Sequence, residues 1–365
     1  MILHFYFARK FALFFAGVLG VFLLLLVLID LVEQLRRFGD TGISFGAVLE
    51  LTLLNAPEGI YGIMPLIMIL ATVAMFLGLA RSSELVVTRA AGRSSLRALL
   101  APVTVALLIG GLMVGMLNPI VAATSKRYGE LQERYQSGGR EAFSISAEGL
   151  WLRQGNETGQ TVIRAARANP DGTVLYEVTF IAFAPGGGPQ RRIEARSARL
   201  TPGAWELTDA KVWPLVAGLN PEATAARHDT LRVPSSLTLD RIRDSFGDPS
   251  VISVWDMPAY IAQLEEAGFS ARRHAMWFQM ELARPLFLVA MLLVGASFTM
   301  RHARAGRAGV AVLSAVVLGF SLYYIRNFAQ ILGENGQIPI LLAAWAPPVA
   351  ALLLGLGLLL ILEEG

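Results

Sequence analysis

Two clusters of long apolar stretches, at residues 11–122 and 276–362, flank a single polar insert. The chain is 54% hydrophobic and only 16% charged, and its mean hydropathy is +0.54. Soluble domains carry about a quarter charged residues, and here the deficit is concentrated in the two flanks. The pattern therefore predicts a membrane protein with several spans and one extramembranous insert.

Six apolar segments are long enough to cross a bilayer, which takes roughly 20 residues per helix. Three precede the insert and three follow it, at about 11–32, 60–80, 98–122, 277–300, 308–330 and 340–362. We expect three regions along the chain: residues 1–125 with spans one to three, 126–270 with the insert, and 271–365 with spans four to six.

The arginines of the short loops predict the orientation of these spans. Arg81, Arg89, Arg93 and Arg97 lie between spans two and three, and a second arginine cluster lies between spans four and five at 301–307. Positively charged short loops stay in the cytoplasm. Both termini are then cytoplasmic and the insert is outside, which in a bacterial inner membrane is the periplasm.

The insert carries strand signals. Apolar residues alternate along one stretch at Val174, Tyr176, Val178 and Phe180, a period of two that is typical of a half-buried strand. Strand candidates recur around 141–153, 161–167, 173–184, 190–200, 204–213 and 227–239, separated by Gly- and Pro-containing turns. They predict an antiparallel sandwich or jelly roll, followed by a short helix from Met257 to Ala267.

Motifs for catalysis are missing from the sequence. The chain has no phosphate loop, no G-x-S-x-G elbow and no H-E-x-x-H metal motif, and its four histidines are scattered. It has no cysteine, which excludes disulfides and thiolate metal sites. These absences disfavour an enzyme.

A short polar segment follows span two. Ser82 or Ser83 can cap a helix there, Glu84 suits its positive N-terminus, and Gly92 can end it. The resulting helix over about 82–93 has two interpretations. It is either an ordinary positively charged loop or a docking helix for a cytosolic partner.

Charged residues also gather at the outer ends of the spans. The membrane disfavours ionisable side chains unless they reach headgroups, partners or a cavity. For any one residue, contact with headgroups is the simpler interpretation, but the basic residues together favour an anionic ligand. The set consists of Asp30, Arg36, Arg37, Lys126, Arg127 and Arg326.

At this point the chain resembles a known family, the LptF/LptG permease subunits of the lipopolysaccharide exporter, over essentially its whole length. Three passages carry the resemblance. Residues 83–92 resemble the family's coupling-helix motif, residues 31–39 resemble the end of its first span, and residues 319–347 resemble its fifth and sixth spans. The last two passages favour LptG over LptF.

The resemblance implies a six-span fold with a periplasmic β-jellyroll domain between spans three and four. It also implies partners: an LptF-type permease, a dimer of a cytosolic LptB-type ATPase, and periplasmic LptC- and LptA-type jellyroll proteins. This chain then binds no cofactor and no nucleic acid, and ATP-Mg is used by the partner ATPase. Lipopolysaccharide is extracted from the inner membrane and passed to a periplasmic bridge. The alternative is a non-transport scaffold whose β domain recruits partners.

The family also implies roles for single residues of this sequence. The residues that would contact the ATPase are Glu84, Leu85, Val86 and Arg89. The residues that would bind lipopolysaccharide are Arg36, Arg37, Lys126 and Arg127. Val174, Tyr176, Val178 and Phe180 would line a slide for acyl chains, although an ordinary β core explains these four equally well.

One departure from the family pattern suggests a further contact. Asp30 replaces a basic residue of span one, and Arg326 replaces an acidic or polar residue of span five. Since the family's lateral gate lies between these two spans, we hypothesise that Asp30 and Arg326 form an ion pair there.

Overall fold

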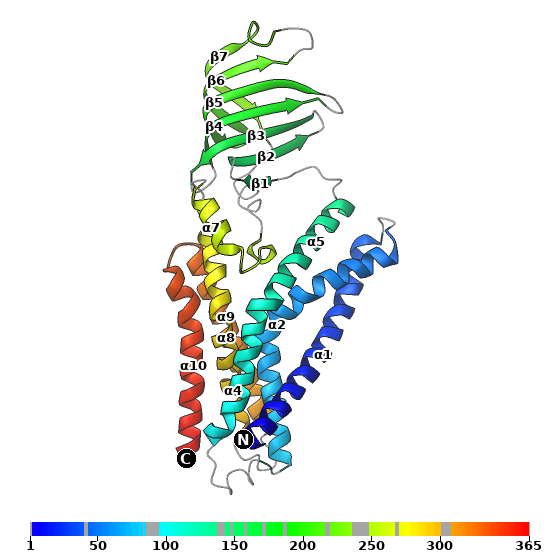
Figure 1. Cartoon of the computed structure of the whole chain (residues 1–365), viewed down its shortest axis with the longest axis vertical. Coiled ribbons are helices and arrows are strands. Elements are labelled where there is room, and N and C mark those ends of the chain that lie inside the picture. Colours follow the sequence, from blue (N-terminus) through cyan, green and yellow to red (C-terminus); the bar gives the residue numbers. More distant parts are fainter. Residues whose placement is uncertain are drawn as a thin grey trace. The chain divides into compact units, whose positions relative to one another are not determined.

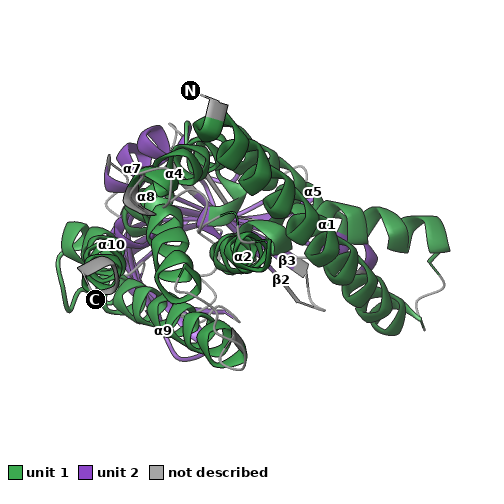
Figure 2. Cartoon of the chain, turned by 90° about the horizontal axis from the view of Figure 1, so that it is seen from below, with its two compact units in different colours: residues 1–131, 250–255, 274–365 green, residues 132–249, 256–273 purple. Residues whose placement is uncertain are grey.

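The computed structural model divides the chain into two compact units, which are described separately (Figure 2). The membrane unit comprises residues 1–131, 250–255 and 274–365. The second unit comprises residues 132–249 and 256–273, and we call it the outer unit after the orientation that the sequence predicts. The structure describes residues 2–39, 43–82, 84, 95–136, 143–146, 149–156, 159–169, 173–184, 188–215, 220–235, 248–266, 270–300 and 308–364.

Among these residues, six helices are long and apolar enough to cross a membrane, which confirms the predicted polytopic fold (Figure 1). The third crossing, Arg97–Gln132, is built from three consecutive elements and contains a π-helical turn. The elements are α1 (Ile2–Phe38), α2 (Phe45–Arg81), α4 (Ser95–Leu112), η1 (Met113–Leu117), α5 (Asn118–Gln136), α8 (Arg272–Thr299), α9 (Ala308–Glu334) and α10 (Ile340–Glu364).

Helices α2 and α8 form the core of the membrane unit. In the most apolar stretch of α8, 78% of the residues are buried, whereas in that of α1 only 6% are buried. Small residues allow the close packing around α8, because a Cβ added at Gly110 on α4 would lie 2.6 Å from the Cα of Pro285. Helices α1, α9 and α10 therefore keep broad apolar faces for lipid or for a partner subunit.

Among the described residues, the outer unit contains one antiparallel sheet of seven strands in sequence order (Figure 1). This confirms the predicted antiparallel β domain, but the first strand candidate is two strands. The hydrogen bonding shows a meander in place of the crossovers of a jelly roll, because short turns make consecutive strands neighbours. The strands are β1 (Phe143–Ser146), β2 (Gly149–Asn156), β3 (Gly159–Ala168), β4 (Val174–Phe183), β5 (Pro189–Thr201), β6 (Ala204–Pro214) and β7 (Ala226–Pro234).

Of the four alternating apolar residues predicted along β4, only two are buried. Val178 and Phe180 are buried, but Tyr176 is 40% exposed and Val174 is only partly buried, while Leu175 is fully buried. The physical reason is Glu177, whose φ of 53° interrupts the extended backbone. The side-chain alternation changes phase there, so the N-terminal half of β4 turns Leu175 inward.

The same change of phase crosses four neighbouring strands. On each strand, two consecutive outward-facing residues stand between two buried residues. The buried pairs are Ala165 and Ala168 on β3, Leu175 and Val178 on β4, Ala195 and Ala198 on β5, and Leu207 and Ala210 on β6. Asp209 on β6 repeats the left-handed backbone with a φ of 55°. Five of the eight buried residues in this row are alanine.

The helix predicted after the strands is confirmed as α7 (Met257–Glu266). Its Leu264 is fully buried and joins the core of the outer unit, beside the ring pair of Phe180 and Trp205.

Candidate functional site

The carboxylate of Glu84, just after α2, is held by residues of its own chain. The ammonium nitrogen of Lys10 on α1 lies 2.7 and 2.8 Å from its two oxygens. The hydroxyls of Tyr6 and Ser82 each donate to it over 2.7 Å. Partial burial opposes ionisation, but these hydrogen bonds together hold the pKa of the Glu84 carboxyl below its ordinary value. We call this group of four residues the Glu84 clasp.

The other residues assigned to ATPase contact, Leu85, Val86 and Arg89, lie outside the described residues. The Glu84 clasp was not predicted from the sequence, in which Lys10 directly precedes the first predicted span. Because Lys10 and Glu84 are 74 residues apart, no local pattern could have paired them.

Asp30 and Arg326 have different neighbours in the structure. One carboxylate oxygen of Asp30 accepts from Asn55 over 2.9 Å and from Gln34 over 3.4 Å. Arg326 is 6% exposed and lies over the ring of Phe287, 5.3 Å from its centre. Within the described part of the chain, Asp30 and Arg326 do not come within the 4 Å of an ion pair. The hypothesised pair is therefore not formed in this conformation.

A buried polar cluster lies in the membrane unit near Arg326. On α8, the Nε of Arg284 lies 3.1 and 3.2 Å from the oxygens of Glu281, and its guanidinium carbon lies 4.1 Å from the centre of the Tyr61 ring. The Tyr61 hydroxyl donates to Glu281, and the Asn118 amide lies 3.4 Å from the same carboxylate. Glu281 is 1% exposed and Arg284 is 8% exposed.

Sequence reasoning missed this cluster. A signal was present, since Glu281 and Arg284 are charged residues three positions apart inside the fourth predicted span. Charges at membrane depth are costly without a partner, and this spacing places both on one helix face. The cluster leaves one more buried cation than anion, because Arg326 adds a second guanidinium to the pair of Glu281 and Arg284.

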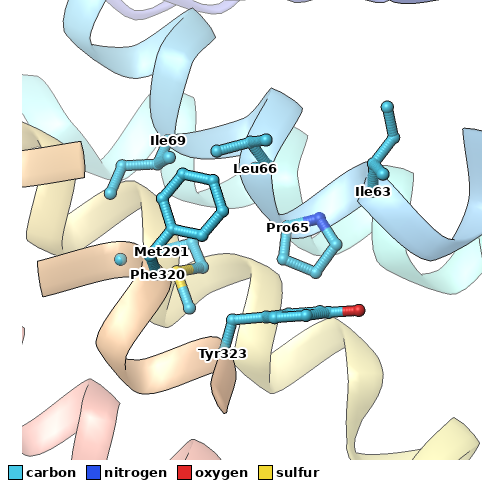
Figure 3. Close-up of a pocket in the computed structure, with 8 residues that line it drawn as sticks. Ile63, Pro65, Leu66, Ile69, Met291, Phe320 and Tyr323 are labelled. Atoms are coloured by element: carbon cyan, nitrogen blue, oxygen red, sulfur yellow. The ribbon is translucent and has the colours of Figure 1, made fainter. Parts of the chain in front are cut away.

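An apolar pocket lies one helical turn from Arg326. Tyr323 and Phe320 of α9 form one side, Pro65 and neighbouring residues of α2 form the other, and Met291 of α8 contributes the floor (Figure 3). Gly319 allows α9 to approach α2 closely, since a Cβ added there would lie 2.6 Å from the Cδ1 of Ile69. The full lining is Ile63, Pro65, Leu66, Ile69, Met291, Gly319, Phe320 and Tyr323.

The basic residues predicted to bind an anionic ligand are exposed. Arg36 and Arg37 end α1 and point away from the helix core, and Lys126 and Arg127 are exposed on α5. Arg127 lies 3.6 Å from Glu130 in an exposed pair, which contributes little to stability. The structure therefore leaves these side chains accessible to a ligand or to headgroups, and their predicted role stays a prediction.

The known proteins that this chain resembles all belong to one family. The family model for the lipopolysaccharide export system permease LptF/LptG matches residues 5–361. The chain is 23% identical over 336 residues to lipopolysaccharide export system permease protein LptG of Escherichia coli K12, covering 91% of each chain. It is 24% identical over 315 residues to LptG of Haemophilus influenzae, covering 85% of this chain and 84% of the relative. With the match extending over nearly all of its length, the chain belongs to the LptF/LptG family of lipopolysaccharide export permeases.

Proposed function

We propose that this chain is the LptG-type permease subunit that moves lipopolysaccharide out of the bacterial inner membrane. Members of its family are permease subunits of lipopolysaccharide export, and the curated relatives carry the name LptG. Six apolar helices make it a multi-pass membrane protein. The finer assignments below rest on particular residues of this chain.

The observation that carries the proposal is the apolar pocket beside a buried guanidinium. A lipid with acyl chains and phosphate groups needs a hydrocarbon site and a cation close together. The pocket between α2, α8 and α9 provides the first, and Arg326 provides the second. We propose that an acyl chain enters along Phe320 and Tyr323 while a lipid A phosphate approaches Arg326 and the exposed Arg36 and Arg37.

Energy for transport comes, in this proposal, from a separate cytosolic ATPase dimer of the LptB type that uses ATP-Mg. The segment after α2 docks on it, with Glu84 at the start of that segment. A second permease of the LptF type completes the cavity, and LptC- and LptA-type proteins receive the lipid. Both termini are cytoplasmic and the outer unit is periplasmic, as the arginines of the short loops indicate.

Val178 and Phe180 remain candidates for the acyl-chain slide, because both face the inner side of the sheet. Val174 and Tyr176 stay in the proposal as well, and Tyr176, which is 40% exposed, is the more accessible of the two. Leu175 is fully buried and is a further candidate on the inner side.

Site-specific photocrosslinking to lipopolysaccharide tests the proposal in the assembled complex. A photoreactive residue at Phe320, which lines the pocket, is compared with one at Leu360 on α10, which is exposed but outside the pocket. We expect a lipopolysaccharide adduct at Phe320 that Arg326→Gln weakens and Arg326→Lys retains. Equal adducts at both positions, unaffected by Arg326→Gln, would show nonspecific lipid contact and favour a scaffold over a transport subunit.

A further inference from the structure

Residues 250–255 belong to the membrane unit although the chain on both sides of them belongs to the outer unit. The short helix η2 (Pro249–Val251) lies at the start of this segment, and α7 begins at Met257, two residues after the segment ends at Trp255. The last link between the outer strands and α7 therefore returns to the membrane unit. Such a return requires specific contacts, because an unattached linker has no reason to pack there.

Two hydrogen bonds attach this segment to the third span. The backbone N–H of Val254 donates to the side-chain oxygen of Asn118 over 2.8 Å, and Val254 is 4% exposed. The indole N–H of Trp255 donates to the carbonyl of Gly115 over 3.1 Å, while most of the ring is exposed. Both bonds reach the junction between η1 and α5.

The sequence of the third span explains why acceptors are available at this junction. Pro119 has no N–H, and in a regular α-helix its N–H would donate to the carbonyl of Gly115 four residues earlier. The helix here widens into the π-turn η1, a feature that is frequent at functional sites. The indole of Trp255 supplies a donor to the carbonyl that proline cannot serve.

Asn118 also connects the segment to the buried polar cluster. Its amide nitrogen lies 3.4 Å from Glu281 and 3.5 Å from the Tyr61 hydroxyl, while its oxygen accepts from Val254. Asn118 therefore contacts both the carboxylate of Glu281 and the backbone of Val254, so it joins the buried cluster to this segment.

We propose that Asn118 and Trp255 are positioning residues that latch the link between the two units onto the π-turn of the third span. The latch connects the charged cluster inside the spans to the chain that leads into α7. It couples rearrangement of the spans to the outer unit during lipid transfer, and this role rests on the proposed function. Neither residue needs to touch the lipid.

The test compares three variants in the full complex in nanodiscs: Trp255→Phe, Pro119→Ala and the double variant. Trp255→Phe removes the indole N–H and keeps an aromatic ring. Trp345→Phe is the matched control, because it loses an indole hydrogen bond of the same 3.1 Å length, to Gln279, elsewhere in the membrane unit. Amide hydrogen exchange of a peptide covering 250–256 and lipopolysaccharide transferred per ATP hydrolysed are both measured.

We expect Trp255→Phe to speed exchange in this peptide by about five- to tenfold, the effect of one lost hydrogen bond, and to lower lipid transferred per ATP. Trp345→Phe should change neither quantity. Pro119→Ala restores a backbone donor for Gly115, so adding Trp255→Phe to it should have a much smaller effect than in the original chain.

Unchanged exchange in Trp255→Phe, or additive effects in the double variant, would overturn the latch itself. Faster exchange with unchanged transfer per ATP would leave only a structural contact and overturn the coupling role. If the unaltered complex transfers no lipopolysaccharide, the proposed function fails, and the exchange data still decide whether the latch exists.

Discussion

Lys10 on the first span and Glu84 after the second form an ion pair in which both carboxylate oxygens lie within 2.8 Å of the ammonium nitrogen. The two side chains are 21% and 32% exposed, so water screens the pair only in part. The pair attaches the start of the proposed docking segment to α1. A force applied to Glu84 by a partner therefore reaches the first span directly.

Reversing the charges of this pair tests the attachment. Lys10→Glu or Glu84→Lys alone should each lower the stability of the membrane unit by about 1 kcal/mol and reduce co-purification of the ATPase. The double exchange should recover most of the lost stability, because the pair is re-formed with opposite sense, but it should not recover the ATPase contact assigned to Glu84 itself. Thermal unfolding in detergent and pull-down of the ATPase measure the two effects.

Arg9→Glu is the control for the charge reversal, since Arg9 is the exposed neighbour of Lys10. It should leave both measurements near those of the unaltered chain. Failure of the double exchange to recover stability would mean that Glu84 acts independently of Lys10.

The Glu84 clasp also predicts a pH dependence. Hydrogen bonds from Lys10, Tyr6 and Ser82 outweigh the effect of burial and lower the pKa of Glu84 from its ordinary 4.5. A lowered folded-state pKa stabilises the fold above the unfolded-state value, and this contribution is lost as the pH falls through the folded-state pKa. The stability difference between the unaltered chain and Glu84→Gln should thus stay constant above pH 4.5 and shrink at lower pH.

Measurements of that difference by chemical unfolding across the acidic range check the prediction. A difference that already shrinks well above pH 4.5 would contradict the lowered pKa of Glu84. Lysine and tyrosine side chains do not ordinarily titrate in the acidic range, so the change is assigned to the carboxylate.

Two adjacent glycines of α4 should respond differently to alanine. A Cβ at Gly110 would lie 2.6 Å from the backbone Cα of Pro285, whereas a Cβ at Gly111 would meet nothing within 4 Å. Gly110→Ala forces α4 and α8 apart and should destabilise the membrane unit by about 1–3 kcal/mol. Gly111→Ala should be neutral or stabilising by up to about 1 kcal/mol, because alanine favours helix.

Thermal unfolding of the two variants in the same detergent gives this comparison. Equal melting temperatures for Gly110→Ala and Gly111→Ala would rule out the close packing of α4 on α8.

Glu177, the residue of β4 with a left-handed backbone, should tolerate substitution by glycine but not by valine. Glu177 has a φ of 53°, which a β-branched side chain tolerates poorly. Glu177→Val should destabilise the β domain by about 1–2 kcal/mol, and Glu177→Gly should be close to neutral. Thr179→Val, two residues along the same strand, is the control and should be tolerated because its backbone is extended.

Amide hydrogen exchange of peptides covering β3 to β6, measured in the full chain during chemical unfolding, monitors the outer unit. If valine at position 177 is as well tolerated as valine at 179, the phase change along β4 is not imposed by the backbone at Glu177.

The sequence predicted the architecture because its signals are local. Uninterrupted apolar runs are long enough to mark six spans whatever surrounds them, and alternation with turn residues marks the strands. The predicted alternation of Tyr176 was wrong because one residue, Glu177, leaves the extended conformation. No apolar pattern identifies that departure, since glutamate gives no sign of a left-handed backbone.

By itself the sequence determined the membrane character, the position of the β insert, and Glu84 as a candidate for docking. Only the tertiary structure decided which distant side chains meet: Lys10 with Glu84, Tyr61 with Glu281 across 220 residues, and Trp255 with Gly115 across 140. It also gave Asp30 and Arg326 different neighbours, although the family resemblance had suggested them as partners. The physical reason is that burial and hydrogen bonding depend on how the helices pack, and periodicity along the chain carries no information about the neighbours of a helix face.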